Sequence, residues 1–161
     1  MAAASNSGAA EIRYPGEAQI VITRDFEAPR HLVYQAWTTP DLIKRWWSGD
    51  RGDVTTAQSD LRPGGAWRYV TASGGSEVTF DGEYREVIPD ERIVWTEMYA
   101  GRPEEGSLNH ATFAEDNGRT TLTLLVQHTN EEHRSEHINA GMEVTMQVGL
   151  DHLEQVVASL R

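Results

Sequence analysis

Residues 36–47 read AWTTPDLIKRWW and hold three of the five tryptophans of the chain. A second run, DLRPGGAWRY at residues 60–69, holds a fourth, Trp67. A small domain seldom concentrates its largest and least solvated side chains unless they line a core or a cavity. The two runs therefore predict a pocket and contain no recognisable catalytic motif.

Length and charge narrow the class of protein. A chain of 161 residues with 39% apolar content has the size of one domain, and folding buries roughly two-thirds of the surface of such a chain. The net charge of −11 opposes binding to nucleic acid and to anionic membranes, because both are recognised mainly by cationic side chains. The chain has no cysteine, which excludes disulfides and thiolate zinc sites.

The N-terminus is expected to be a tail. Its first ten residues are small and polar and lack the basic start and apolar run of a secretory signal. No window reaches the roughly 18 apolar residues of a membrane span. We expect a disordered tail over residues 1–14, one domain over residues 15–161, and a cytoplasmic location.

A strand and two short helices are predicted before the second tryptophan run. Residues 19–26 alternate between two faces and carry β-branched side chains, which favours a strand. Pro29 suits the first turn of a helix, and a second helix begins at Pro40 with Thr39 as its cap. The apolar residues at helical spacing on these two helices are Leu32, Val33, Ala36, Trp37, Ile43, Trp46 and Trp47.

Turn residues divide residues 54–128 into strand-length pieces. Asn117-Gly118 is the clearest hairpin turn, because this pair tolerates the positive φ angles of a type I′ turn. Further turns are expected at residues 64–65, 74–75, 89–90 and 103–106. The pattern predicts a meander of antiparallel strands.

The C-terminal segment changes to helical spacing. Residues 129–132 fit a capping box over a short helix, and Ala140-Gly141 interrupts it. A long amphipathic helix follows, whose stripe consists of Met142, Met146, Gly149, Leu153, Val156 and Leu160. The order of elements predicts an α+β fold in which the last helix covers one face of the sheet.

Alternation along the strands indicates which residues face that helix. Arg68 should be solvated, so Trp67 and Tyr69 turn inward. By the same reasoning the inward set includes Val78, Phe80, Gly82, Tyr84, Leu122, Leu124, Val126 and His128. Gly82 suggests a bend in its strand. The faces of residues 93–99 and 108–114 stay undecided, and an ordinary solid core is the alternative to a pocket.

The sequence evidence for a catalytic or metal site is weaker than the evidence for a pocket. His133 and His137 have the spacing of a metal pair on one helix face, but the segment is polar throughout and a solvated face is favoured. His128 and His110 lack the partners of a catalytic triad. Glu83 and Glu97 are a conceivable carboxylate pair that nothing places together. We expect no catalytic residue, no metal and no cofactor.

Several motifs together resemble a known family. They are Trp37 with Thr38 and Pro40, Trp46-Trp47, Arg62-Pro63-Gly64-Gly65, the run from Gly82 to Pro89 with Ile93-Val94-Trp95-Thr96, and Gly141-Met142. The chain resembles, over about residues 18–160, bacterial relatives of the C-terminal domain of the activator of heat-shock protein 90 ATPase, in the START-like (SRPBCC) superfamily. The resemblance implies a helix-grip fold, in which a curved antiparallel sheet wraps a long C-terminal helix and leaves a cavity.

Three kinds of function follow from this resemblance. The first is a protein that binds a small apolar or aromatic molecule, as superfamily carriers and proteins that protect against toxic compounds or stress do. The second is an enzyme of polyketide cyclase or hydrolase type. The third is a module that contacts a chaperone, although the chain has no room for the extra N-terminal domain of eukaryotic activators. We expect a monomer or homodimer. The residues expected to contact a ligand are Trp37, Trp46, Trp47, Trp67, Tyr69, Phe80, Tyr84, Trp95, Leu124, Val126, His128, Met142, Met146 and Gly149.

Overall fold

The computed structural model describes residues 9–99 and 102–161. Eight strands and four helices follow one another along these residues. They are β1 (Glu11–Arg13), β2 (Gln19–Phe26), α1 (Arg30–Thr38), α2 (Pro40–Ile43), β3 (Asp53–Ser59), β4 (Ala66–Ser73), β5 (Ser76–Ile88), β6 (Arg92–Tyr99), β7 (Arg102–Asp116), β8 (Arg119–His128), α3 (Glu131–Asn139) and α4 (Met142–Ser159).

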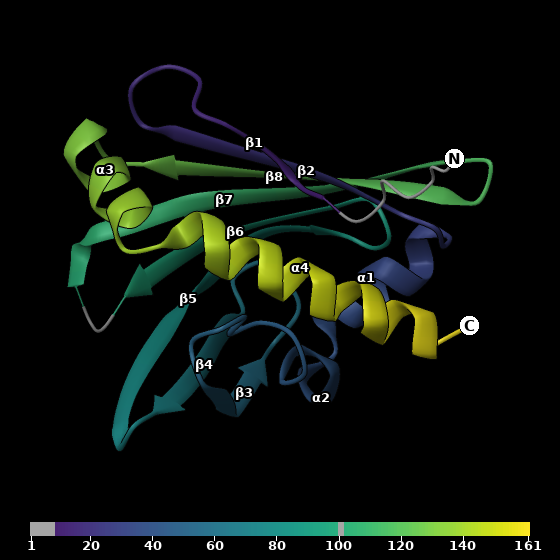
Figure 1. The fold of residues 1–161 in the computed structure, drawn as a ribbon, viewed down its shortest axis with the longest axis horizontal. Coiled ribbons are helices and arrows are strands. Elements are labelled where there is room, and N and C mark those ends of the chain that lie inside the picture. Colours follow the sequence, from purple (N-terminus) through teal and green to yellow (C-terminus); the bar gives the residue numbers. More distant parts are fainter. Residues whose placement is uncertain (1–8, 100–101) are drawn as a thin grey trace.

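The strands form one curved antiparallel sheet, in the order β1-β2-β8-β7-β6-β5-β4-β3. Helix α4 crosses one face of this sheet, and α1 and α2 lie near its C-terminal half (Figure 1). The helix-grip architecture expected from the sequence is confirmed. The chain returns to β2 through β8, so the first long strand and the last one are neighbours.

Local sequence explains several element boundaries. Asn117 and Gly118 adopt φ angles of 54° and 77° and close the hairpin between β7 and β8, as predicted. Gly141, with φ of 89°, separates α3 from α4. The capping box predicted at residues 129–132 is wrong, because Thr129 is not the residue that caps α3. Asn130 holds that position, and its side chain accepts a hydrogen bond from the backbone N–H of His133 at 2.9 Å.

Two other expectations need correction. Glu11–Arg13, assigned to the tail, forms β1 and pairs with β2, because its backbone groups complete the ladder at the edge of the sheet; residues 1–8 of that tail lie outside the described part of the chain. The turn predicted at residues 103–106 belongs to β7, which begins at Arg102. Pro103 lies before Ser107, where the pairing of β7 with β8 begins, so it interrupts no part of that ladder.

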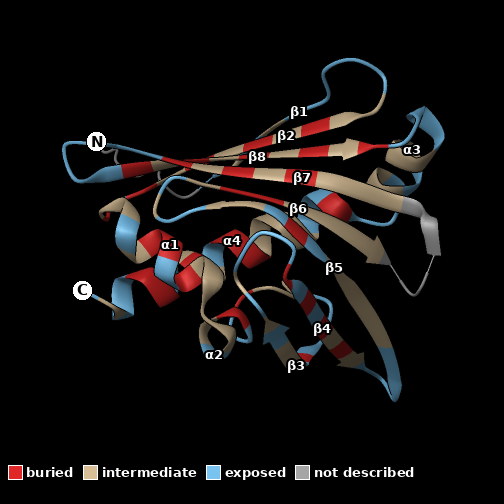
Figure 2. Cartoon of the chain, turned by 180° about the vertical axis from the view of Figure 1, so that it is seen from behind, coloured by how far each residue is buried: buried red, intermediate tan, exposed pale blue. Residues whose placement is uncertain are grey.

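One half of the molecule is a closed aliphatic core. The inward residues of β2 and β8 pack against α4, and Ile20, Leu122 and Leu153 are almost completely buried. Figure 2 shows this burial along β2, β8, β7 and α1. The core also holds Arg24, which is only 2% exposed. Its guanidinium donates to Asp151 at 2.7 Å and Glu154 at 3.0 Å, so two carboxylates of α4 balance the buried charge.

Candidate functional site

The other half of the molecule gathers aromatic side chains around a small cavity. Its walls come from the end of helix α1, the loop after α2, and the inner face of β4, β5 and β6. The cavity has a volume of about 30 Å³ and is lined by Trp37, Thr38, Trp46, Trp47, Trp67, Tyr69, Tyr84, Ile93 and Trp95. All five tryptophans therefore meet here, the four of the two sequence runs and Trp95 of β6. A volume of this size holds about one water molecule.

Three tryptophans form one wall. The ring centroids of Trp37 and Trp46 are 4.8 Å apart, and those of Trp37 and Trp95 are 6.2 Å apart. The indole N–H of Trp46 donates to the carbonyl of Ala36 at 3.0 Å. Trp46 is thus anchored to the end of α1 and forms a fixed part of the site.

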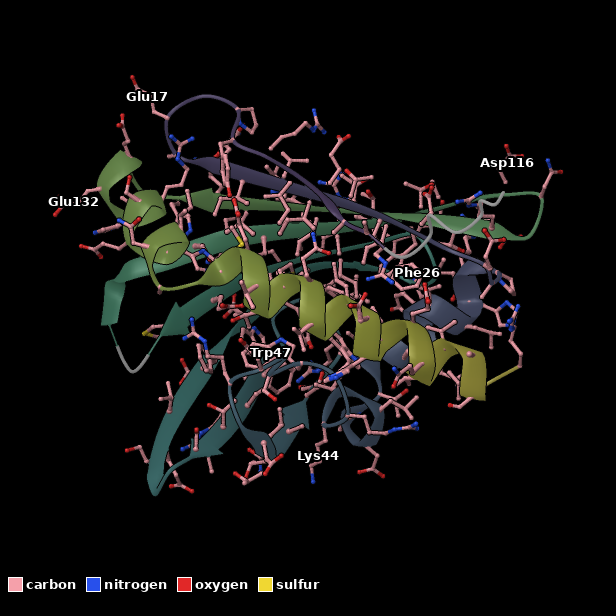
Figure 3. The ribbon with its side chains drawn as sticks, viewed as in Figure 1. Glu17, Phe26, Lys44, Trp47, Asp116 and Glu132 are labelled. Atoms are coloured by element: carbon pink, nitrogen blue, oxygen red, sulfur yellow. The ribbon has the colours of Figure 1, made fainter. Side chains whose placement is uncertain are left out.

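Trp47 forms the opposite wall and is held less firmly. Its ring meets Tyr69 at 5.1 Å and Phe80 at 4.8 Å, in both cases edge to face. It lies between α4 and the β3–β4 part of the sheet (Figure 3). The residue is only half-buried and belongs to the irregular segment between α2 and β3.

Gly82 lets Trp67 lie across the sheet. The two residues are direct partners on β5 and β4. The indole N–H of Trp67 donates to the carbonyl of Thr96 on β6 at 3.0 Å, so the Trp67 side chain reaches across β5. A Cβ at position 82 would lie 1.8 Å from that carbonyl oxygen and 2.8 Å from the indole nitrogen. The predicted importance of Gly82 is therefore steric, and the bend lies further along, at a bulge between Tyr84 and Glu86.

A group of hydroxyls lies beside the aromatic rings. The hydroxyls of Ser59 and Tyr84 are 2.7 Å apart. Burial raises the pKa of Tyr84, and the hydrogen bond with Ser59 opposes the shift. Burial also raises the pKa of Tyr69 well above its usual value, and its contact with Tyr84 and the nearby carboxyl of Glu97 add to the shift. Both tyrosines therefore stay protonated and can donate hydrogen bonds.

Glu97 is the ionisable group that the sequence left unplaced. Asp81 pairs with Met98 and Tyr84 with Trp95, so Glu97 lies opposite Gly82 on the inner face of β6. Burial raises its pKa to about 7, and a hydrogen bond from Trp95 opposes the shift. The residue as a whole is partly buried. The neighbouring Glu83 is exposed on the outer face, which rules out the carboxylate pair with Glu97.

The remaining predicted ligand residues lie outside the cavity wall. Leu124 and Val126 are buried in the aliphatic core of β8. On α4, Met142 is buried and Met146 packs partly against the core. Gly149 allows close contact between α4 and the loop, since a Cβ there would lie 3.1 Å from the carbonyl oxygen of Trp46. Thr38, Ile93 and Ser59 were not among the ligand residues predicted from the sequence, and Glu97 was considered there only as a partner of Glu83.

His128 also lies apart from the cavity, where it meets α3. Its Nε2 is 2.9 Å from Nδ1 of His137. The favoured prediction of a solvated face for His133 and His137 is wrong, because both are half-buried against the end of β8. Burial lowers the pKa of His137 to about 4, and the charges of His128 and Arg51 add to this. Burial also lowers the pKa of His128.

Other candidate chemistries find little support within residues 9–99 and 102–161. Nδ1 of His110 lies 3.0 Å from a guanidinium nitrogen of Arg92, which gives it a structural partner. In this part of the chain, no cluster of three or more His, Cys, Asp or Glu side chains is suited to hold a metal ion. None of the described helices is both long and apolar enough to cross a bilayer.

Solved structures share this fold. A protein of Rhodobacter sphaeroides superposes with a TM-score of 0.86 at 22% identity, over 95% of this chain and all of its own. A protein of Arthrobacter aurescens gives a TM-score of 0.85 at 16% identity, over 92% of this chain and 91% of its own. A protein of Nitrosomonas europaea gives a TM-score of 0.83 at 21% identity, over 91% of this chain and 98% of its own. Identities this low establish the fold alone.

Sequence comparison identifies the family. An uncharacterised 17.2 kDa protein of Streptomyces lincolnensis is 26% identical over 96 residues, which is 60% of each chain. The family model of the activator of Hsp90 ATPase homolog 1-like proteins matches residues 27–158, from the end of β2 to the last turn of α4. This range contains every residue of the aromatic cavity. The chain belongs to the family of activator of Hsp90 ATPase homolog 1-like proteins.

Proposed function

We propose that this protein binds a small hydrophobic or aromatic molecule between α4 and the β3–β6 half of the sheet. The observation that carries the proposal is the convergence of all five tryptophans on one cavity. Aromatic side chains offer large apolar area and specific edge-to-face contacts to a planar guest. The family fold supports a binding scaffold of this kind.

A ligand needs more room than a cavity of about 30 Å³ offers. Trp47 is the side chain best suited to give way, because it is half-buried and its two ring contacts are made edge to face. Such contacts contribute about 0.5–1.5 kcal/mol each. An aromatic ligand that makes the same contacts with Tyr69 and Phe80 would offset the loss. We therefore propose that the ligand takes the place of Trp47.

The test is a titration with 1-methylnaphthalene followed by NMR. The five tryptophans provide five indole N–H signals, all at the proposed site. We expect these signals to shift together and to saturate. Trp47→Ala should increase the affinity several-fold by opening the site, whereas Val144→Ala, an exposed position on α4, should not. If no indole signal of the folded protein moves up to the solubility limit, the proposal is wrong.

A second candidate function is acid–base catalysis on a carbonyl compound. Glu97, with its pKa raised to about 7 by burial, would be able to give or take a proton near neutral pH. Tyr69 would then be a hydrogen-bond donor to the substrate. Exchange of the α-protons of 1-tetralone with deuterated solvent tests this candidate. We expect acceleration over buffer that is lost in Glu97→Gln; no acceleration would leave binding as the function.

A chaperone-binding role draws less support from this structure. The large apolar side chains that are exposed in the described residues are Tyr14, Ile88 and Val144. They lie on the loop after β1, at the end of β5 and on α4. The Tyr14 hydroxyl donates a hydrogen bond to Glu143, the neighbour of Val144, so only these two meet at one element. Surfaces that bind other proteins usually present contiguous apolar area.

A further inference from the structure

The aromatic half of the sheet contains a carboxyl group without a matching charge among the side chains that the structure describes. Among the described residues, the partner of Glu97 is the indole N–H of Trp95. Within residues 9–98 and 106–161, whose side chains the structure describes, no cationic side chain forms an ion pair with it. A buried ionisable group is normally neutralised by a partner or by its own protonation. Glu97 is thus a group whose charge depends on what lies beside it.

The cavity beside Trp95 and Tyr69, the two lining residues that interact with Glu97, favours positive charge. The cavity wall consists of indole and phenol rings with Thr38 and Ile93, and it includes no lysine, arginine or histidine. The faces of aromatic rings carry partial negative charge and attract cations within about 6 Å of the ring centre. The net charge of −11 adds a long-range attraction in the same direction.

Arg24 shows how this same fold stabilises a buried cation. Its guanidinium carbon lies 5.5 Å from the centre of the Phe26 ring, and two carboxylates balance its charge. The aromatic half offers the same two components, rings and a carboxyl group. There the described side chains supply no cation to pair with the carboxyl group.

We infer that the aromatic site is selective for organic cations, with an alkyl- or arylammonium group between the tryptophan rings and its charge balanced by Glu97. This inference rests on the proposed function and specifies the class of ligand. An anionic ligand is disfavoured, because it would face ring surfaces and a carboxyl group. A neutral ligand that accepts a hydrogen bond from the protonated Glu97 is the competing possibility.

The pH dependence of binding distinguishes a cationic ligand from a neutral one. A cation binds best when Glu97 is ionised, so its affinity should rise between pH 6 and pH 8. Among the described side chains, the other groups with shifted pKa values move away from that range. Tyr69 and Tyr84 have raised pKa values, and His128 and His137, which lie apart from the cavity, have lowered ones. Arg51 contacts Ala140 and Thr145 at the start of α4.

The experiment compares N-methylquinolinium with 1-methylnaphthalene by calorimetry at pH 6 and pH 8. The two molecules have nearly the same shape, and neither titrates. We expect the cation to bind more tightly than the hydrocarbon at pH 8, and to lose up to about tenfold in affinity at pH 6, as the ionised fraction of Glu97 falls. The hydrocarbon should bind equally at both pH values.

Glu97→Gln should abolish both the preference for the cation and its pH dependence. Glu83→Gln is the matched control, because it removes the same charge from the exposed face of the neighbouring strand. Equal binding of the two probes, or a cation affinity indifferent to Glu97→Gln, overturns the inference while the hydrocarbon still supports the proposed function. Tighter binding of 1-acetylnaphthalene at pH 6 than at pH 8 would also overturn it, and binding of neither probe removes both proposals. The pH dependence of the unmodified protein decides the matter even if the variant fails to fold.

Discussion

Each half of the sheet places a chargeable side chain on its inner face, Arg24 in one and Glu97 in the other, and the two have different partners. Under α4, Arg24 is paired with Asp151 and Glu154, and aliphatic residues fill the space around it. On β6, the carboxyl group of Glu97 accepts a hydrogen bond from the indole N–H of Trp95, and burial raises its pKa. The charge of Arg24 is therefore balanced by carboxylates of the chain itself. Glu97 is the kind of perturbed group that marks functional sites.

The aliphatic half is also packed more tightly than the aromatic half. Leu150 and Leu153 of α4 are essentially inaccessible in the aliphatic half. In the aromatic half, Trp47, Phe80 and Met146 are only partly buried, and a small cavity lies next to Trp47. Substitutions in the two halves should therefore have different costs.

The largest difference is expected along α4. Leu153 is fully buried, so Leu153→Ala should lower the free energy of unfolding by about 2–5 kcal/mol. Met146 makes fewer contacts, and Met146→Ala should cost less than about 2 kcal/mol. Urea denaturation of both variants measures this. Equal, large losses would mean that α4 closes one continuous solid core.

Gly82→Ala should affect the aromatic half in particular. The new methyl group would collide with the Thr96 carbonyl and displace the Trp67 indole, with a cost of about 2–3 kcal/mol. The near-ultraviolet circular dichroism of the tryptophans should weaken at the same time. An unchanged spectrum would show that Trp67 does not depend on the space over Gly82.

Glu97→Gln should change how stability varies with pH. The folded state raises the pKa of Glu97 to about 7 from 4.5 in the unfolded chain. The folded state therefore binds the proton more tightly, and this residue makes the protein less stable as pH rises from 4.5 to 7. The variant should be more stable than the original at pH 8, by up to about 2 kcal/mol, with little difference at pH 4. Thermal unfolding at both pH values checks this, with Glu83→Gln as the control.

His137→Gln should have a smaller effect of opposite sign. Folding lowers the pKa of His137 from 6.5 to about 4, so the unfolded chain takes up the proton first and stability falls as pH drops from 6.5 to 4. The variant should lose less stability over that range than the original protein, by about 1 kcal/mol or less. His152→Gln, on α4, is the comparison. Parallel pH profiles for the variant and the original protein would contradict the assigned burial of His137.

Alternation was a reliable guide where one face of a strand was clearly polar. It placed Trp67 and Tyr69 inward on β4 and predicted the buried side of β8 correctly. It failed on β6, where Val94 and Ile93 are both apolar and both buried. The face of β6 was decided by its pairing with β5 and by the bulge between Tyr84 and Glu86, and a bulge between distant strands leaves no periodic signal.

The histidines of α3 show the same limit for a helix. This segment is polar in every direction, so its sequence indicated no buried side. The loop after β8 nevertheless folds α3 back until His137 meets His128. Burial of His137 therefore comes from the position of the helix, and not from its composition.

The sequence by itself determined the local elements, the hairpin at Asn117-Gly118, the break at Gly141 and the clustering of tryptophans, because these depend on nearby residues and on periodic burial. Only the tertiary structure decided that Glu97 lies opposite Gly82, within reach of Tyr69 and Trp95. The pKa of a carboxyl group depends on how much protein surrounds it, and here that protein comes from strands distant in the sequence. The same pairing of distant strands places a carboxyl group among the tryptophans.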